Sequence, residues 1–151
     1  MHVSEGILPV EQAAAWTAVA VPMLAWSIHG ERQARLEKPT ASLVMSAVTS
    51  LLFAATMLPL PVPVVGATSH ICLTPVLALL VGIRRIFWPT FFVLLLQAVF
   101  FAHGGLTTLG VNTLALGWVG PLLTLGVWNL LRRLGTPASF GLAVACGLGG
   151  L

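Results

Sequence analysis

Hydrophobic positions along the chain gather into long apolar runs instead of alternating with polar ones. Six apolar segments are separated by short connections that hold most of the charged residues: about 10–29, 40–58, 71–82, 86–102, 113–131 and 137–151. A helix needs roughly 20 predominantly apolar residues to cross a bilayer, and most of these runs approach that length. The pattern predicts an all-α, polytopic transmembrane helical bundle of about six spans. The last segment is still apolar at Leu151, so we expect that span to be cut short.

The composition supports an integral membrane protein, whose helices are surrounded by lipid. Hydrophobic residues make up 58% of the sequence and charged residues only 7%, whereas the surface of a soluble domain needs more charge than this. The length fits one domain over residues 1–151. Cys72 and Cys146 stand alone within apolar segments, so we interpret both as small apolar side chains.

The positive charges indicate a topology. All seven lie in alternate connections, at Arg32, Arg35, Lys38, Arg84, Arg85, Arg132 and Arg133. By the positive-inside rule these connections face the cytoplasm, and their position at helix ends is not typical of nucleic-acid binding. We therefore expect a cytoplasmic (inner) membrane protein with its N-terminus outside. His2, His70 and His103 then share the outer side.

The N-terminal Met1-His2 pair has the chemistry of a metal chelator. A histidine in second position offers a free amine, a backbone amide nitrogen and an imidazole to one ion. Such a set of nitrogens favours square-planar Ni²⁺ or Cu²⁺. The alternative is a histidine that follows the first methionine by chance.

His70 is the next candidate ligand. It ends a connection stiffened by Pro59, Pro61 and Pro63 and directly precedes the short third segment. Neutral imidazole is a common metal ligand and can supply a fourth nitrogen. Taken alone, His70 is better interpreted as a polar helix cap. Together with Met1-His2, the metal site becomes the better hypothesis.

Polar residues near membrane depth form a third set. They are candidates to orient the ligands by hydrogen bonds, and they comprise Ser69, Gln97, His103, Thr107, Thr108 and Asn112. The alternative is that they only hold neighbouring helices together.

Three stretches resemble one protein family. They are residues 1–9 (MHVSEGILP), Thr68-Ser69-His70, and residues 102–113 (AHGGLTTLGVNT). This order is similar to the CbiM/NikM-type substrate-binding membrane components of cobalt and nickel energy-coupling-factor transporters. The resemblance implies that the N-terminus folds back into an outer pocket, where Met1, His2 and His70 hold Ni²⁺ or Co²⁺. The ion is the cargo, and no prosthetic group is expected.

The resemblance also implies partners. These are a membrane coupling subunit, cytoplasmic ABC-type ATPases and a small accessory membrane subunit. The sequence has no GxxxxGK[ST] motif for ATP, which agrees with a subunit that binds metal and is not an enzyme. Family members normally continue beyond the sixth segment, so the chain is expected to be shorter than they are at its C-terminal end.

Two other function classes are compatible with a polytopic membrane chain. An intramembrane metalloenzyme would need a catalytic base near its metal, but the sequence contains no Asp and no HExxH motif. A purely structural membrane subunit would bind no metal, and its properties would not depend on His2 or His70.

Overall fold

The computed structural model describes residues 3–62 and 67–150, with side chains described within 3–59 and 70–150. The elements in chain order are α1 (Val10–Glu37), α2 (Ala41–Met57), β1 (Pro59–Val62), β2 (Ala67–His70), α3 (Thr74–Val81), α4 (Ile83–Phe101), α5 (Leu109–Leu114), η1 (Ala115–Val119), α6 (Gly120–Arg133) and α7 (Ala138–Gly150). The predicted helical fold class is confirmed. The hairpin of β1 and β2 is an addition to it, because the sequence indicated only a connection stiffened by prolines after α2.

Within the residues that the structure describes, two helical stretches are long and apolar enough to cross a membrane. One is α4, and the other is the continuous run Leu109–Arg133, in which the π-helical turn η1 joins α5 to α6. The apolar helices α2 and α7 are shorter, with 17 and 13 residues. α3 has only eight residues, which agrees with the short third apolar segment of the sequence.

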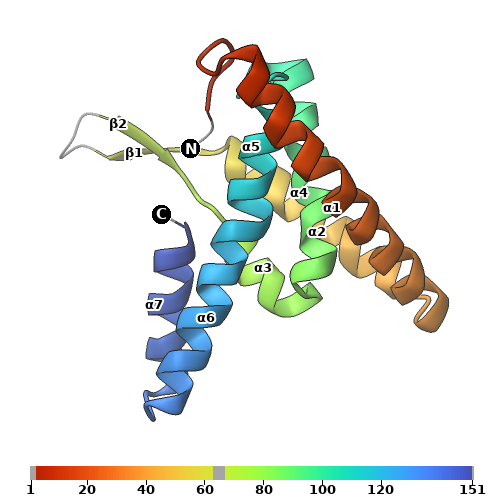
Figure 1. Ribbon diagram of the computed structural model, residues 1–151. Helices are drawn as coiled ribbons and strands as arrows, with labels where there is room; N and C mark the ends of the chain where they lie inside the picture. The colour runs from red at the N-terminus through yellow and green to blue at the C-terminus, as the bar shows by residue number, and fades with distance from the viewer. Residues whose placement is uncertain (1–2, 63–66, 151) are drawn as a thin grey trace.

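The helices are arranged in two arms (Figure 1). α1 packs against α4 and α5, and α2 packs against α4. On the other side, α6 and α7 form a helical hairpin, and the β-hairpin projects from the end of the molecule that carries the N-terminus. The largest apolar core lies between α2, α3 and α4, and it contains Met45, Val48, Leu52, Leu77, Ala78, Val81, Ile86 and Val93.

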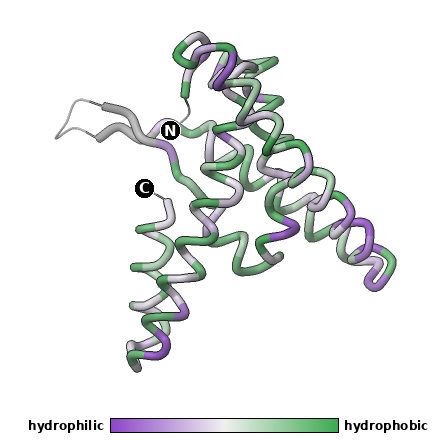
Figure 2. Tube along the Cα trace, viewed as in Figure 1, coloured by the Kyte–Doolittle hydropathy of each residue, from purple (hydrophilic) through white to green (hydrophobic). Residues whose placement is uncertain are grey.

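Charged residues gather at one end of the bundle. Figure 2 shows hydrophilic segments at the end of α1, at the junction of α3 and α4, and at the end of α6. The first two of these meet directly, because Arg85 lies 2.8 Å from the buried carboxylate of Glu31. Large apolar side chains are exposed along the helices between the ends, for example Val44, Leu51 and Leu123. An apolar outer surface with charges at its edge is what a bilayer requires.

Candidate metal site

His70 is placed by the β-hairpin. It is the last residue of β2 and pairs with Pro59, while Pro61 pairs with Thr68. Proline has no N–H to give to a ladder, but prolines two residues apart leave the amides of Leu60 and Val62 available to the partner strand. The hairpin therefore forms despite its prolines. His70 is half-buried, and its buried Nδ1 finds no hydrogen-bond partner among the described residues.

His103 is placed by the end of α4. Ala102 adopts a left-handed conformation with φ of 49°, and the N–H groups of Ala102 and His103 both donate to the carbonyl oxygen of Gln97. This turn brings the imidazole of His103 against that of His70, with ring centroids 5.0 Å apart and the planes at 65°. Two segments distant in sequence thus contribute one histidine pair.

The surroundings of His103 favour its neutral imidazole. Burial lowers the pKa of His103, and the neighbouring His70 lowers it further because two positive rings would repel one another. Neutral imidazole is the form that binds a metal ion.

The N-terminal segment is fixed beside the 103–112 stretch by its backbone. The Val3 N–H donates to Oδ1 of Asn112 at 2.8 Å, and the Val3 carbonyl accepts from Nδ2 of Asn112 at 3.0 Å. The hydroxyl of Thr108 donates to the same carbonyl at 2.7 Å. Asn112 and Thr108 are both buried, so these bonds are shielded from competing solvent.

Glu5 makes a second attachment. Its carboxylate accepts hydrogen bonds from the hydroxyl and the backbone N–H of Thr107, and these bonds lower the pKa of Glu5. Gly105 makes room for this contact, since a Cβ at that position would lie 2.8 Å from Cα of Glu5. The segment 3–5 and the 103–112 stretch are therefore fitted to one another (Figure 1).

The predicted residues separate into groups. His70 and His103 come together, and Thr107, Thr108 and Asn112 hold the N-terminal segment. The side chain of Gln97 instead donates to Thr56 at 2.6 Å and joins α4 to α2, which is the interhelical role that the sequence left open. Met1 and His2 lie outside the described residues, as does the side chain of Ser69.

Sequence reasoning missed the roles of Val3, Glu5 and Gly105. Val3 contributes only backbone groups, which carry no signal in its side chain.

Within the described side chains, no group of three or more His, Cys, Asp or Glu residues could hold a metal ion. The histidine pair therefore supplies at most two side-chain nitrogens from this part of the chain.

The fold and the site define an integral helical membrane protein with an imidazole pair and a tethered N-terminal segment at one end of its bundle. The chain belongs to the CbiM family, described as the cobalt uptake substrate-specific transmembrane region, which it matches over residues 2–151. The resemblance found in the sequence is thereby confirmed.

Relatives and solved structures agree with this assignment. The cobalt transport protein CbiM of Geobacter sulfurreducens is 40% identical over the whole chain, which spans 42% of that relative. The cobalt transport protein CbiM of Sorangium cellulosum is 37% identical over 99% of the chain and 74% of its own length. A crystal structure of a truncated transition metal transporter has a TM-score of 0.83 and 25% identity, and the match covers 99% of this chain and 68% of that one.

Proposed function

We propose that residues 1–151 form one binding domain that takes up Co²⁺ or Ni²⁺ at the outer end of the bundle for ATP-driven import. In this proposal the chain has no ATPase activity of its own. A membrane coupling subunit and cytoplasmic ABC-type ATPases, with a small accessory membrane subunit, supply the energy. The N-terminus lies outside the cytoplasmic membrane of a bacterial or archaeal cell.

The attachment of Val3 beside the 103–112 stretch carries this proposal. Consecutive Cα atoms lie about 3.8 Å apart, so fixing Val3 limits where the two preceding residues can reach. The amine of Met1, the amide and imidazole of His2, and an imidazole nitrogen of His70 are the proposed ligands. The buried Nδ1 of His70 has no hydrogen-bond partner in the described part of the chain, and this supports its role as an acceptor for a cation.

The remaining polar residues have supporting roles in the proposed site. His103 contacts His70 and orients its ring. Asn112 and Thr108 hold the backbone that leads to His2. Ser69, next to His70, is proposed to help position that ring. Partners of this kind set the orientation and basicity of metal ligands.

The experiment that tests the ligand assignment compares His70→Ala with His103→Ala. We expect His70→Ala to lower Ni²⁺ affinity by more than about 1,000-fold, because one of four nitrogens is lost. His103→Ala should cost about 10- to 100-fold, the usual effect of a group that orients a ligand. Calorimetry gives the affinities, and the absorption spectrum of bound Ni²⁺ reports a square-planar site.

The reverse result would identify a different fourth ligand. If His70→Ala kept the spectrum and the affinity while His103→Ala lost both, His103 would be the ligand. If neither substitution changed binding, the histidine pair would have no part in holding the metal. Circular dichroism of both variants confirms that the helices are retained.

A further inference from the structure

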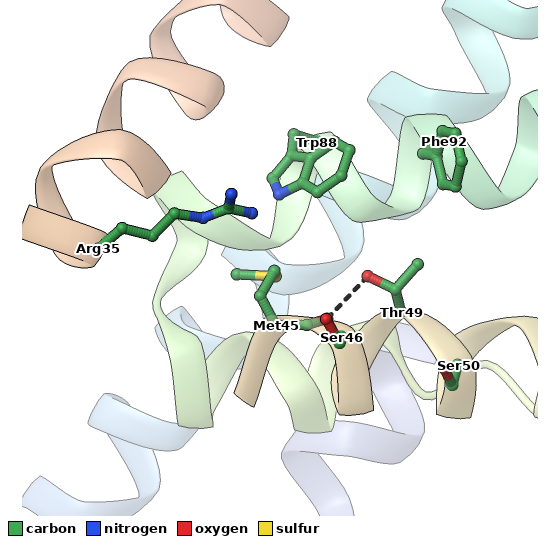
Figure 3. A pocket seen from close by; sticks show the side chains of 7 residues that line it. All are labelled: Arg35, Met45, Ser46, Thr49, Ser50, Trp88 and Phe92. Atoms are coloured by element: carbon green, nitrogen blue, oxygen red, sulfur yellow. Dashed lines mark hydrogen bonds between the residues drawn. The ribbon is translucent and has the colours of Figure 1, made fainter. Parts of the chain in front are cut away.

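A groove lies at the end of the bundle that carries the positive charges, away from the histidine pair. It has a volume of about 300 Å³ and is lined by residues of α1, α2 and α4: Arg35, Met45, Ser46, Thr49, Ser50, Trp88 and Phe92 (Figure 3). A smaller hollow of about 180 Å³ adjoins it and shares Arg35 and Trp88. The proposed metal site uses none of these residues.

The groove presents one buried hydrogen-bond donor that lacks an acceptor among the described residues, and a guanidinium group lies near it. The Nε1–H of Trp88 is buried and has no partner among the described residues. Arg35 bonds to Glu31 through Nε at 2.9 Å, and Figure 3 shows its guanidinium extending toward the indole of Trp88. Guanidinium and indole groups only donate. An acceptor placed between them would satisfy a buried N–H that is otherwise costly to leave unpaired.

The charge around the groove is positive. Glu31 lines the adjoining hollow, and its carboxylate is shared between Arg35 at 2.9 Å and Arg85 at 2.8 Å. Arg32 lines the adjoining hollow and adds a third cation. Two or three guanidinium groups around one carboxylate leave a net positive charge, so the missing acceptor is expected to be an anion.

The groove changes from charged to apolar along its length. Arg35 lies in the last turn of α1, whereas Phe92 lies one turn beyond Trp88 into α4, a helix long and apolar enough to span a membrane. Met45 forms a buried part of the lining, while Phe92 is 39% exposed. The charged end thus lies at the level of a membrane surface and the apolar end points into the bilayer.

We propose that this groove binds an anionic membrane phospholipid. Arg35 and the indole N–H of Trp88 hold its phosphate, the hydroxyls of Ser46 and Ser50 bond to its polar glycerol region, and an acyl chain lies along Phe92. Arginine recognises phosphate through paired, charge-assisted hydrogen bonds, and basic pockets between membrane helices bind lipid head groups. A helix from another protein would supply an anionic acceptor here only if it carried a carboxylate at this position.

The test titrates phosphatidylglycerol with brominated acyl chains into the full chain in detergent and follows tryptophan fluorescence. We expect saturable quenching, an affinity at least about tenfold lower in Arg35→Gln, and a loss of several-fold in Trp88→Phe, since each removes a bond to a charged group. Trp88→Phe keeps an aromatic ring in place and so tests the N–H with little change in packing. Arg133→Gln removes a cation at the end of α6 and is the matched control, with no change expected.

Three outcomes would overturn the proposal. The first is unchanged phosphatidylglycerol affinity in both Arg35→Gln and Trp88→Phe. The second is equal binding of brominated phosphatidylcholine, which would show that net charge has no role. The third is full competition by inorganic phosphate at concentrations equal to those of the lipid, which would make free phosphate the ligand in place of a lipid.

Discussion

Asn112 uses both ends of one amide group to hold the N-terminal segment. Its oxygen accepts from the N–H of Val3, and its nitrogen donates to the carbonyl of Val3 and to the hydroxyl of Thr108. An amide carries donors and an acceptor in fixed geometry, so it can pair with a single backbone residue as a neighbouring strand would. Asn112 is 5% exposed. A replacement that cannot bond would leave the N–H of Val3 without this acceptor and its carbonyl with the Thr108 hydroxyl alone.

We therefore predict that Asn112→Leu lowers Ni²⁺ affinity by about 10- to 100-fold, the range for groups that position metal ligands. The leucine has a similar size, so the helical content should be unchanged. Calorimetry with Ni²⁺ measures the effect. Asn129→Leu is the matched control, because Asn129 is exposed on α6. This variant should bind Ni²⁺ as tightly as the unaltered chain. If Asn112→Leu and Asn129→Leu had the same affinity, the Val3 contacts would have no role in metal binding.

The 103–108 connection between α4 and α5 is built to receive the N-terminal segment. Its glycines permit this, since Gly104 has a φ of 90° and Gly105 lies so close to Glu5 that a Cβ would collide with it. Helix α5 also lies close to α1, because a Cβ at Gly110 would lie 2.7 Å from the backbone nitrogen of Thr17. Small residues thus allow both α1 and the segment before it to approach α5.

At the level of this connection, we predict that Gly105→Ala displaces residues 3–5 and lowers metal affinity by at least about tenfold, comparable with the loss of a positioning group. The helices should remain, because the atoms nearest to the added methyl group belong to Glu5 and Thr108 and not to the middle of a helix. Limited proteolysis near the N-terminus, together with Ni²⁺ calorimetry, checks both points.

Gly126→Ala is the control for this substitution. A Cβ at Gly126 in α6 meets nothing within 4 Å, and alanine in a helix is favoured over glycine by about 0.5–1 kcal/mol. This variant should bind metal normally and unfold at the same or a higher temperature. If Gly105→Ala bound metal as well as Gly126→Ala, the fit between Glu5 and the connection would be irrelevant to the site.

Over the whole molecule, the two ends of the bundle are chemically distinct. Arg35 and Arg133 lie in the last turns of α1 and α6, and Arg85 lies in the first turn of α4, where Figure 2 shows hydrophilic segments. The histidine pair lies beyond the other end of α4. The expected orientation places the positive end in the cytoplasm, so incoming metal would reach the histidines from outside.

Single-cysteine labelling tests this orientation in a chain with Cys72→Ala and Cys146→Ala. Leu36 and Leu134 are 87% and 71% exposed at the positive end, and Leu106 is 55% exposed at the other. We predict that an impermeant maleimide applied outside intact cells labels Leu106→Cys and leaves Leu36→Cys and Leu134→Cys unlabelled until the cells are opened. External labelling of Leu36→Cys would invert the topology.

Hydropathy sufficed to predict the helices because length and apolar content are properties of single segments. The histidine pair was predicted only as a shared side, since the contact of His70 with His103 depends on the left-handed turn at Ala102 and on the hairpin register. The role of Gln97 was left open because one amide serves equally in a metal site or between helices, and its bond to Thr56 depends on how α2 packs on α4. Backbone contacts such as those of Val3 leave no trace in the sequence.

The most direct test of the central claim is a Ni²⁺ titration of the chain with one glycine added before Met1, compared with the unextended chain. The proposed site needs a free amine one residue before His2, so the extension should abolish tight binding while circular dichroism stays unchanged. A single glycine added after Leu151 is the matched control and should bind normally. If the chain extended at its N-terminus bound Ni²⁺ with unchanged affinity, the amine of Met1 would not be a ligand and the proposed site would be wrong.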